Sequence, residues 1–294
     1  MARDGGGVRC ELVCRAPKRS TLALRANVEN LLKCESLAHC THRSSLGSEW
    51  SAHTCRYFSV LTWALGAATA MNPVVLSYNN CLLRRADVAL LEPPNWFNDQ
   101  VMAFAFEYME LEEFVGMPNN QKLCFIGPEV SHFIKFSPDE EIGVVLGPLD
   151  LQQKDFVFLA INDHASPNTS GGTHWSLLLY DRATDTFRHY DSSQGSCNST
   201  QALHTARRLK LFLGRDESLN PIFSEKVETP QQENAYDCGM YVLCHARLLA
   251  REFMLGRVGP TLNEIITPSY VTQQRRELRQ LIDKLAKQNH IASN

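Results

Sequence analysis

Three segments of strand length in the middle of the chain, with helical patterns on either side, limit the folds that it can adopt. Residues 156–161 form a continuous apolar run, and residues 174–180 and 186–191 have the composition of two strands joined by a short polar turn. Apolar residues recur every three or four positions along 96–111 and 238–253, which is the spacing of helices that bury one face. Strands and helices in this order predict one α+β domain.

Further elements extend the predicted domain on both sides of the hairpin. Residues 202–213 are expected to form a helix, and residues 222–227 alternate like a strand. A last helix is expected to start at Pro268, because proline is favoured in the first turn. Asn95 is expected to cap the helix that follows it, since an asparagine side chain can accept a bond from a free backbone N–H group there.

The first 70 residues differ in character from the rest of the chain. They contain one proline, a glycine run at positions 5–7, and no sustained helical or alternating apolar pattern. The periodic patterns begin directly after Met71, which is the first methionine after Met1. We therefore expect residues 1–70 to be a poorly ordered N-terminal extension, and residues 71–294 to form the domain.

Charge and hydropathy argue against two kinds of partner. The 294 residues carry a formal net charge of −3, without the basic excess that is typical of nucleic-acid binding. An apolar segment at 57–71 is too short for a membrane span, since about 15 helical residues cover roughly 22 Å of a hydrocarbon core of about 30 Å. We therefore expect neither a nucleic acid nor a membrane as a partner.

The ten cysteines follow no regular framework, and no Cys-x-x-Cys pair occurs among them. Candidate zinc ligands are Cys10 and Cys14, with Cys34, His39, Cys40 and His42 downstream, but this second cluster lacks the paired spacing of zinc fingers. We therefore predict no metal and no cofactor. Reduced thiols in an intracellular protein are the expectation, with the cytoplasm and nucleus as its location.

Cys238 stands at the start of a predicted helix, directly after a polar segment. The first turn of a helix presents unpaired backbone N–H groups at the positive end of the helix dipole, so it favours the thiolate form of a cysteine. Cys238 is therefore a candidate nucleophile. A small buried cysteine at a helix start is the alternative that this segment alone leaves open.

A candidate base and a carboxylate lie at the two ends of the predicted hairpin. His174 opens the first strand and Asp191 ends the second, so pairing through the short turn brings both residues to one edge of the sheet. A nucleophile, a histidine and a carboxylate are the groups of a catalytic triad. A lone histidine at a strand end is more often structural, but its conjunction with Cys238 indicates catalysis.

Several short motifs carry a resemblance to a known family. In chain order they are His174-Trp175-Ser176, Tyr190-Asp191-Ser192, Gln232 and Asp237-Cys238-Gly239. This set resembles the ubiquitin-like-protein proteases, also called sentrin-specific proteases. The segment Asn95-Trp96-Phe97-Asn98-Asp99 is similar to that family's Trp-Leu-Asn-Asp helix start, with Phe97 in place of the usual leucine. The opening Pro-Val-Val-Leu-Ser-Tyr and the Phe-Leu-Ala-Ile-Asn-Asp at 158–163 most resemble the deneddylase member.

The resemblance implies a papain-like α+β fold in which helices flank a mixed central sheet and the catalytic cysteine begins a helix. It also implies that Cys238 attacks the carbonyl of a C-terminal glycine, with His174 as its base and Asp191 orienting the imidazole. Gln232 and the backbone N–H of Cys238 would donate to the oxyanion.

The resemblance further implies three substrate contacts. Trp96 and Trp175 would wall a narrow tunnel for a Gly-Gly tail, and Asp99 would contact a basic residue of the modifier. The alternatives are ordinary core tryptophans and an aspartate that the helix dipole favours in a first turn.

The expected activity is that of a thiol protease and isopeptidase, a hydrolase that cleaves after the Gly-Gly of a ubiquitin-like modifier. It would process the precursor of the modifier and remove it from conjugates such as cullins, which is deneddylation. A SUMO-specific protease is the nearest alternative, because the triad is common to both and the docking surface makes the choice. A non-catalytic binder of ubiquitin-like proteins would not need the intact set of Cys238, His174, Asp191 and Gln232. The expected partners are the modifier and its conjugates, and a monomer is expected.

Overall fold

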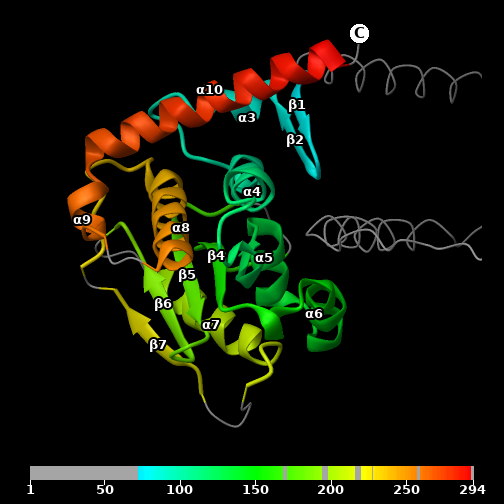
Figure 1. Cartoon of the computed structure of the whole chain (residues 1–294), viewed down its shortest axis with the longest axis vertical. Coiled ribbons are helices and arrows are strands. Elements are labelled where there is room, and N and C mark those ends of the chain that lie inside the picture. The colour runs from blue at the N-terminus through cyan, green and yellow to red at the C-terminus, as the bar shows by residue number, and fades with distance from the viewer. Residues whose placement is uncertain are drawn as a thin grey trace, which may run out of the picture.

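The computed structural model describes residues 72–167, 171–193, 198–215, 220–226, 228–256 and 259–292. A five-stranded sheet lies at its centre with helices on both faces, and a two-stranded hairpin lies under the C-terminal helix (Figure 1). The expected extension and the candidate zinc ligands in it fall outside the described residues.

The strands, in chain order, are β1 (Val74–Tyr78), β2 (Cys81–Arg84), β3 (Leu123–Ile126), β4 (Phe156–Asn162), β5 (Trp175–Asp181), β6 (Thr186–Tyr190) and β7 (Ile222–Glu225). The α-helices are α3 (Arg85–Ala89), α4 (Asp99–Tyr108), α5 (Pro128–Phe136), α6 (Asp139–Leu146), α7 (Asn198–Lys210), α8 (Cys238–Leu255), α9 (Leu262–Ile265) and α10 (Pro268–Ala292). Four short helical turns complete the elements of the described residues: η1 (Met109–Glu113), η2 (Asn120–Lys122), η3 (Gly147–Leu149) and η4 (Leu151–Gln153).

The central sheet has the strand order β3-β4-β5-β6-β7. The pairs β3–β4 and β6–β7 are parallel, whereas β4–β5 and β5–β6 are antiparallel, so the sheet is mixed as expected. The short turn after β5 sets the register of the central hairpin, in which Asp181 faces Thr186 and Leu177 faces Tyr190.

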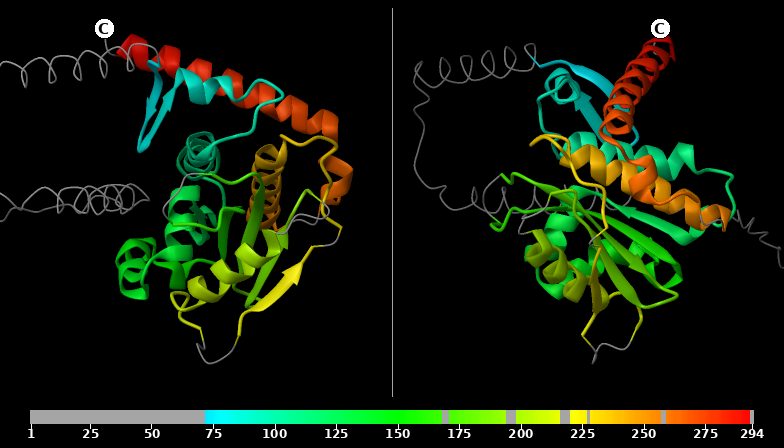
Figure 2. Two further views of the ribbon diagram at one scale, coloured as in Figure 1. Left: turned by 180° about the vertical axis from the view of Figure 1, so that it is seen from behind. Right: turned by 90° about the vertical axis from the view of Figure 1, so that its left-hand side faces the viewer.

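Each face of the sheet carries its own apolar core. Leu177 and Leu179 point to the side of α4, α8 and α10, while Leu178 and Tyr180 point to the side of α5, α6 and α7. Figure 2 shows the two layers of helices with the sheet between them. Because both faces are covered, the strand β4 is apolar at successive positions, which explains the continuous apolar run seen in the sequence.

The predicted elements are confirmed in type, with shifts at their ends. The helix expected over 96–111 begins at Asp99, and its cap is Asn98, whose Oδ1 accepts a hydrogen bond of 3.1 Å from the N–H of Val101. The prediction of Asn95 as the cap was wrong, because its amide instead donates to the carbonyls of the preceding turn. Residues 95–98 are thereby left outside the helix, and three of them, Trp96, Phe97 and Asn98, line a cleft described below.

Other boundaries and elements also differ from prediction. The helix expected over 202–213 runs from Asn198 to Lys210, and the strand expected over 222–227 ends at Glu225, while position 227 lies outside the described residues. The β1–β2 hairpin, the edge strand β3 and the helices α5 and α6 were not predicted. These segments are short, so they carry few periods of an apolar pattern.

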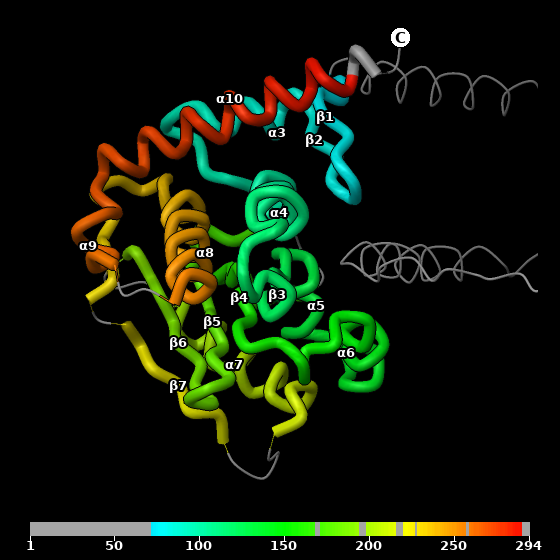
Figure 3. The backbone as a smooth tube through the Cα atoms, viewed as in Figure 1, coloured from blue at the N-terminus to red at the C-terminus, as the bar shows by residue number. Residues whose placement is uncertain are grey.

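The helix α10 crosses the top of the molecule and contacts both β1 and α8 (Figure 3). Its residues Leu278 and Ile282 are buried, as expected from their spacing. Among the described residues, no helix combines the length and apolar character that crossing a lipid bilayer requires.

Candidate active site

Cys238 is the first residue of α8, and its side chain is almost completely buried against the sheet. The N–H of Tyr241 donates to the carbonyl of Asp237, which marks this point as the start of the helix. The thiol therefore lies in the first turn, where backbone N–H groups favour negative charge. A Cβ on the next residue, Gly239, would come within 3.0 Å of the Cβ of Phe97, so glycine lets this helix start pack closely against the segment before α4.

His174 and Asp191 meet at one end of the β5–β6 hairpin, as predicted. The Nε2 atom of His174 lies 2.6 Å from Oδ1 of Asp191, and both side chains are mostly buried. The same carboxylate oxygen accepts a bond of 3.0 Å from the N–H of Ser193, which helps to hold its orientation. Because Nε2 faces Asp191, Nδ1 is the ring nitrogen left for Cys238.

The charges around the imidazole favour its protonated form. Burial alone would lower the pKa of His174, but hydrogen bonds to Asp191 and Cys238, together with the negative charges of these partners, raise that pKa to about 10. At neutral pH the site therefore holds an imidazolium beside the sulfur atom. This pairing stabilises a thiolate, which is the nucleophilic form of cysteine.

Gln232 is held beside the hairpin end by three hydrogen bonds. Its backbone N–H donates to the carbonyl of Ser192 at 2.8 Å, and its Oε1 accepts from the Ser192 hydroxyl at 2.8 Å. Its Nε2 donates to the carbonyl of Asn234 at 2.6 Å. Since an amide NH₂ carries two N–H groups, this arrangement uses one donor and is compatible with a second bond to an oxyanion.

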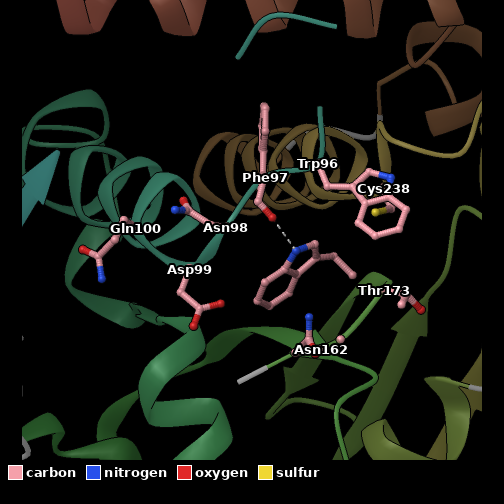
Figure 4. A pocket seen from close by; sticks show the side chains of 11 residues that line it. Trp96, Phe97, Asn98, Asp99, Gln100, Asn162, Thr173 and Cys238 are labelled. Atoms are coloured by element: carbon pink, nitrogen blue, oxygen red, sulfur yellow. Dashed lines mark hydrogen bonds between the residues drawn. The ribbon is translucent and has the colours of Figure 1, made fainter. Parts of the chain in front are cut away.

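A cleft of about 420 Å³ opens in front of Cys238. Figure 4 shows residues of the segment before α4 on one side of it, with Asn162 and Thr173 on another. The lining brings together the three predicted substrate contacts, Trp96, Asp99 and Trp175, with the candidate nucleophile. Glycines 171 and 172 also contribute to the lining, which leaves room for an extended chain.

The two tryptophans of the cleft differ in exposure. Trp175 is 5% exposed and donates its indole N–H to the carbonyl of Phe97 at 3.0 Å, whereas Trp96 is 45% exposed. Trp96 donates to the carbonyl of Ala235 at 2.6 Å, just before α8. Trp175 thus forms part of the core, while the ring of Trp96 is an exposed apolar surface of the cleft.

Residues 95–287 match the model of the Ulp1 protease family, C-terminal catalytic domain. The chain belongs to this family. It is therefore a cysteine-type peptidase with the Ulp1-like α+β fold.

Two proteases that are similar to this chain differ in their sequence identity to it. The chain is 46% identical over 224 residues to sentrin-specific protease 8 of Mus musculus, covering 76% of this chain and 98% of that one. It is 30% identical over 226 residues to NEDD8-specific protease 1 of Arabidopsis thaliana, covering 74% and 96%. These similarities confirm the resemblance to the deneddylase member.

A solved structure of the family supports the fold. The C-terminal Ulp1 protease domain in complex with Smt3, the yeast orthologue of SUMO, aligns with a TM-score of 0.56 at 19% identity. The alignment covers 83% of this chain and 99% of that one. At this identity the comparison shows the common fold.

Sequence reasoning missed two side chains that hold the machinery of this Ulp1-family site. Asp163 accepts three hydrogen bonds, from the N–H and hydroxyl of Thr173 and from the N–H of His174. Ser192 holds Gln232, although it was quoted in a motif without a role. No local pattern identifies such residues, because each acts on a segment that only the folded sheet brings near. In the described part of the chain, no three His, Cys, Asp or Glu side chains gather as metal ligands.

Proposed function

We propose that this protein is a deneddylating thiol protease that cleaves after the C-terminal Gly-Gly of a cullin-activating ubiquitin-like modifier. It would process the modifier precursor and release the modifier from conjugates such as cullins. The observation that carries this proposal is the 2.6 Å contact of His174 with Asp191 beside Cys238, at the end of a cleft lined by two tryptophans. The similarity to a protease named as NEDD8-specific supports the choice of modifier.

In the proposed mechanism, the thiolate of Cys238 attacks the carbonyl carbon of the final glycine. Gln232 and the backbone N–H of Cys238 donate to the oxyanion that develops. The imidazolium of His174 gives its proton to the leaving amine, which departs and leaves a thioester. His174 then takes a proton from water, the hydroxide attacks the thioester, and the thiolate and a free glycine carboxylate result. Asp191 keeps the imidazole in the orientation that both steps need.

The cleft suits the tail that this reaction requires. A Gly-Gly tail has no side chains, so it passes between Trp96 and Trp175 where a larger residue would not. Asp99 lies in the same lining and would attract a basic residue of the modifier. Binding of this kind depends on the body of the modifier for affinity, since two glycines bury little apolar surface.

The catalytic domain in this proposal comprises residues 71–294, with residues 1–70 as an extension. The domain would act as a monomer, because every proposed catalytic group comes from one chain. The proposed location is the cytoplasm and nucleus, where cullin conjugates would be reached.

A panel of C-terminally activated modifiers tests the proposal. NEDD8, SUMO and ubiquitin, each carrying a thiol-reactive warhead after the last glycine, are incubated with the full chain and with Cys238→Ala. We expect rapid covalent capture of NEDD8 by the wild type and none by the variant. Preferred capture of SUMO would contradict the assignment as a deneddylase and indicate a SUMO protease. Binding of a modifier without covalent capture would indicate a non-catalytic binder.

A further inference from the structure

Arg275 is a buried cation on α10 that reaches the start of α8, the helix that Cys238 begins. Its side chain is 2% exposed, and its Nη2 lies 2.8 Å from Oδ1 of Asp237, whose side chain is 7% exposed. Asp237 directly precedes Cys238, and its other carboxylate oxygen accepts a bond of 2.8 Å from Asn234. A buried guanidinium is expensive to desolvate, so its place here calls for a reason beyond filling space.

The same guanidinium holds the segment that carries the exposed tryptophan of the cleft. It donates to the carbonyl of Asn95 at 3.1 and 3.2 Å and to that of Leu90 at 3.0 Å. Its centre lies 4.4 Å from the centroid of the Phe97 ring. Trp96 is thereby fixed on both sides, by residues that Arg275 contacts.

Arg275 also holds the loop before α8. It donates to the carbonyl of Tyr236 at 3.3 Å and lies 5.5 Å from the centre of that ring. One side chain therefore connects two segments near the sulfur, the segment before α4 and the loop before α8. Its planar fork of five N–H groups suits this task, since a lysine could not reach so many carbonyls at fixed angles.

The charge of Arg275 has a second consequence for the nucleophile. A carboxylate one residue from Cys238 repels a thiolate, and burial strengthens that repulsion because little water screens it. The guanidinium of Arg275 lies against this carboxylate, with 2.8 Å between Nη2 and Oδ1, and the two groups form a buried charge pair. The pair leaves the dipole of α8 and the imidazolium of His174 unopposed at the sulfur.

We propose that Arg275 is a positioning residue of the active site, which neutralises Asp237 beside the thiolate and fixes Trp96 at the cleft. This inference rests on the role of Cys238 in the proposed function. The ionisable groups around the sulfur and this pair come from α4, α10, the start of α8 and one end of the β5–β6 hairpin: Asp99, Arg275, Asp237, His174 and Asp191. Of these, Asp237 and Arg275 form the ion pair whose two members the experiments below replace one at a time.

Alkylation of Cys238 by iodoacetamide tests the charge without any modifier. The rate is followed against pH in the full chain by mass spectrometry of the peptide that contains Cys238, because other cysteines also react. Arg275→Met leaves the carboxylate uncompensated, so we expect the pH midpoint of alkylation to rise by about one unit. Asp237→Asn leaves the cation uncompensated, so the midpoint should fall. The double variant should return close to the wild type.

These opposite signs separate a charge effect from general damage. Arg279→Met is the matched control, since Arg279 lies one turn further along α10, is 36% exposed and pairs with Asp283. We expect this control to leave the midpoint unchanged. If Arg275→Met does not fold, the test rests on Asp237→Asn and the double variant. The alkylation midpoint should fall in Asp237→Asn and return close to that of the wild type in the double variant. Shifts of the same sign in both single variants, or no shift in either, would overturn the charge part of the proposal.

Arg275→Lys tests the positioning of the cleft. This variant keeps the charge but not the fork, so the alkylation midpoint should stay near that of the wild type. With a NEDD8-derived substrate, KM should rise about tenfold with a smaller change in kcat, because Trp96 loses its support. An unchanged KM would refute this part. Failure of the proposed function is distinguishable, since it would appear in the wild type as a Cys238 that is alkylated no faster than an ordinary thiol.

Discussion

Asp163→Ala should misplace His174, the proposed base, without changing any residue of the proposed triad. Asp163 follows the last residue of β4, and its carboxylate accepts bonds of 2.7 Å from both the N–H and the hydroxyl of Thr173 and 3.2 Å from the N–H of His174. These bonds, with the charge of His174, keep the pKa of Asp163 below its usual value against the opposing effect of burial. Alanine removes all three bonds at once.

The magnitude follows from these bonds. A hydrogen bond to a charged group contributes about 1.5–3 kcal/mol, and the value falls where water can replace the lost partner. Because Asp163 is only partly buried, we expect a total loss of about 2 kcal/mol in the free energy of unfolding. The larger effect should be on catalysis, since a misplacement of about 1 Å in the reacting groups reduces the rate on the order of 10²-fold.

The assay compares kcat, KM and the free energy of unfolding in urea. Asp163→Asn serves as a second variant, because its amide can still accept and donate at the same positions, and it should keep most of the activity. Asp155→Ala is the matched control at the other end of β4, where the carboxylate lies 4.0 Å from Lys122. A kcat of Asp163→Ala within twofold of the wild type would refute the reasoning, and so would an equal loss in Asp155→Ala.

Other predictions address the triad, the oxyanion, the termini and pH. Cys238→Ala should abolish turnover while it retains modifier binding by calorimetry, and adding His174→Ala should make little further difference, because groups that act as a unit are not additive. Gln232→Ala should lower kcat about 10²–10³-fold if its amide donates to the oxyanion, whereas an effect confined to KM would place it in binding. Deleting residues 1–70 should leave the melting temperature and kcat/KM unchanged, and a large drop in either would make the extension part of the domain. The raised pKa of His174 stabilises the fold fully below the ordinary histidine value of about 6.5, and this contribution should vanish as pH rises through about 10. Urea unfolding across this range should show the loss in the wild type and a smaller loss in Asp191→Asn.

Local patterns carried most of the prediction of the fold class and of the triad. The pairing of His174 with Asp191 was predictable because a short turn forces two neighbouring strands together, so their ends meet whatever the rest of the chain does. The helix at Cys238 was predictable from the apolar period that follows it. The resemblance added Gln232 and the substrate contacts, which periodicity alone would not have selected.

The remaining features depend on contacts between distant segments. The strands of the parallel pairs β3–β4 and β6–β7 are connected through helices that cross the sheet. No short turn joins the paired strands, so the local sequence does not indicate that they pair. The late start of α4 leaves Trp96 and Phe97 outside the helix, where the indole of Trp175 and the start of α8 pack against Phe97. These contacts override the local preference for a cap at Asn95.

The amino-acid sequence by itself indicated the candidate nucleophile, base and carboxylate, because all three stand at the ends of elements that form locally. Only the tertiary structure decided what holds them. Asp163 acts on His174 across neighbouring strands, and Arg275 reaches Asn95 from 180 positions away. Such partners carry no local signal, since an arginine in an amphipathic helix has the same sequence pattern whether it faces water or a buried carboxylate. Because α10 packs over the start of α8, Arg275 faces the buried carboxylate of Asp237.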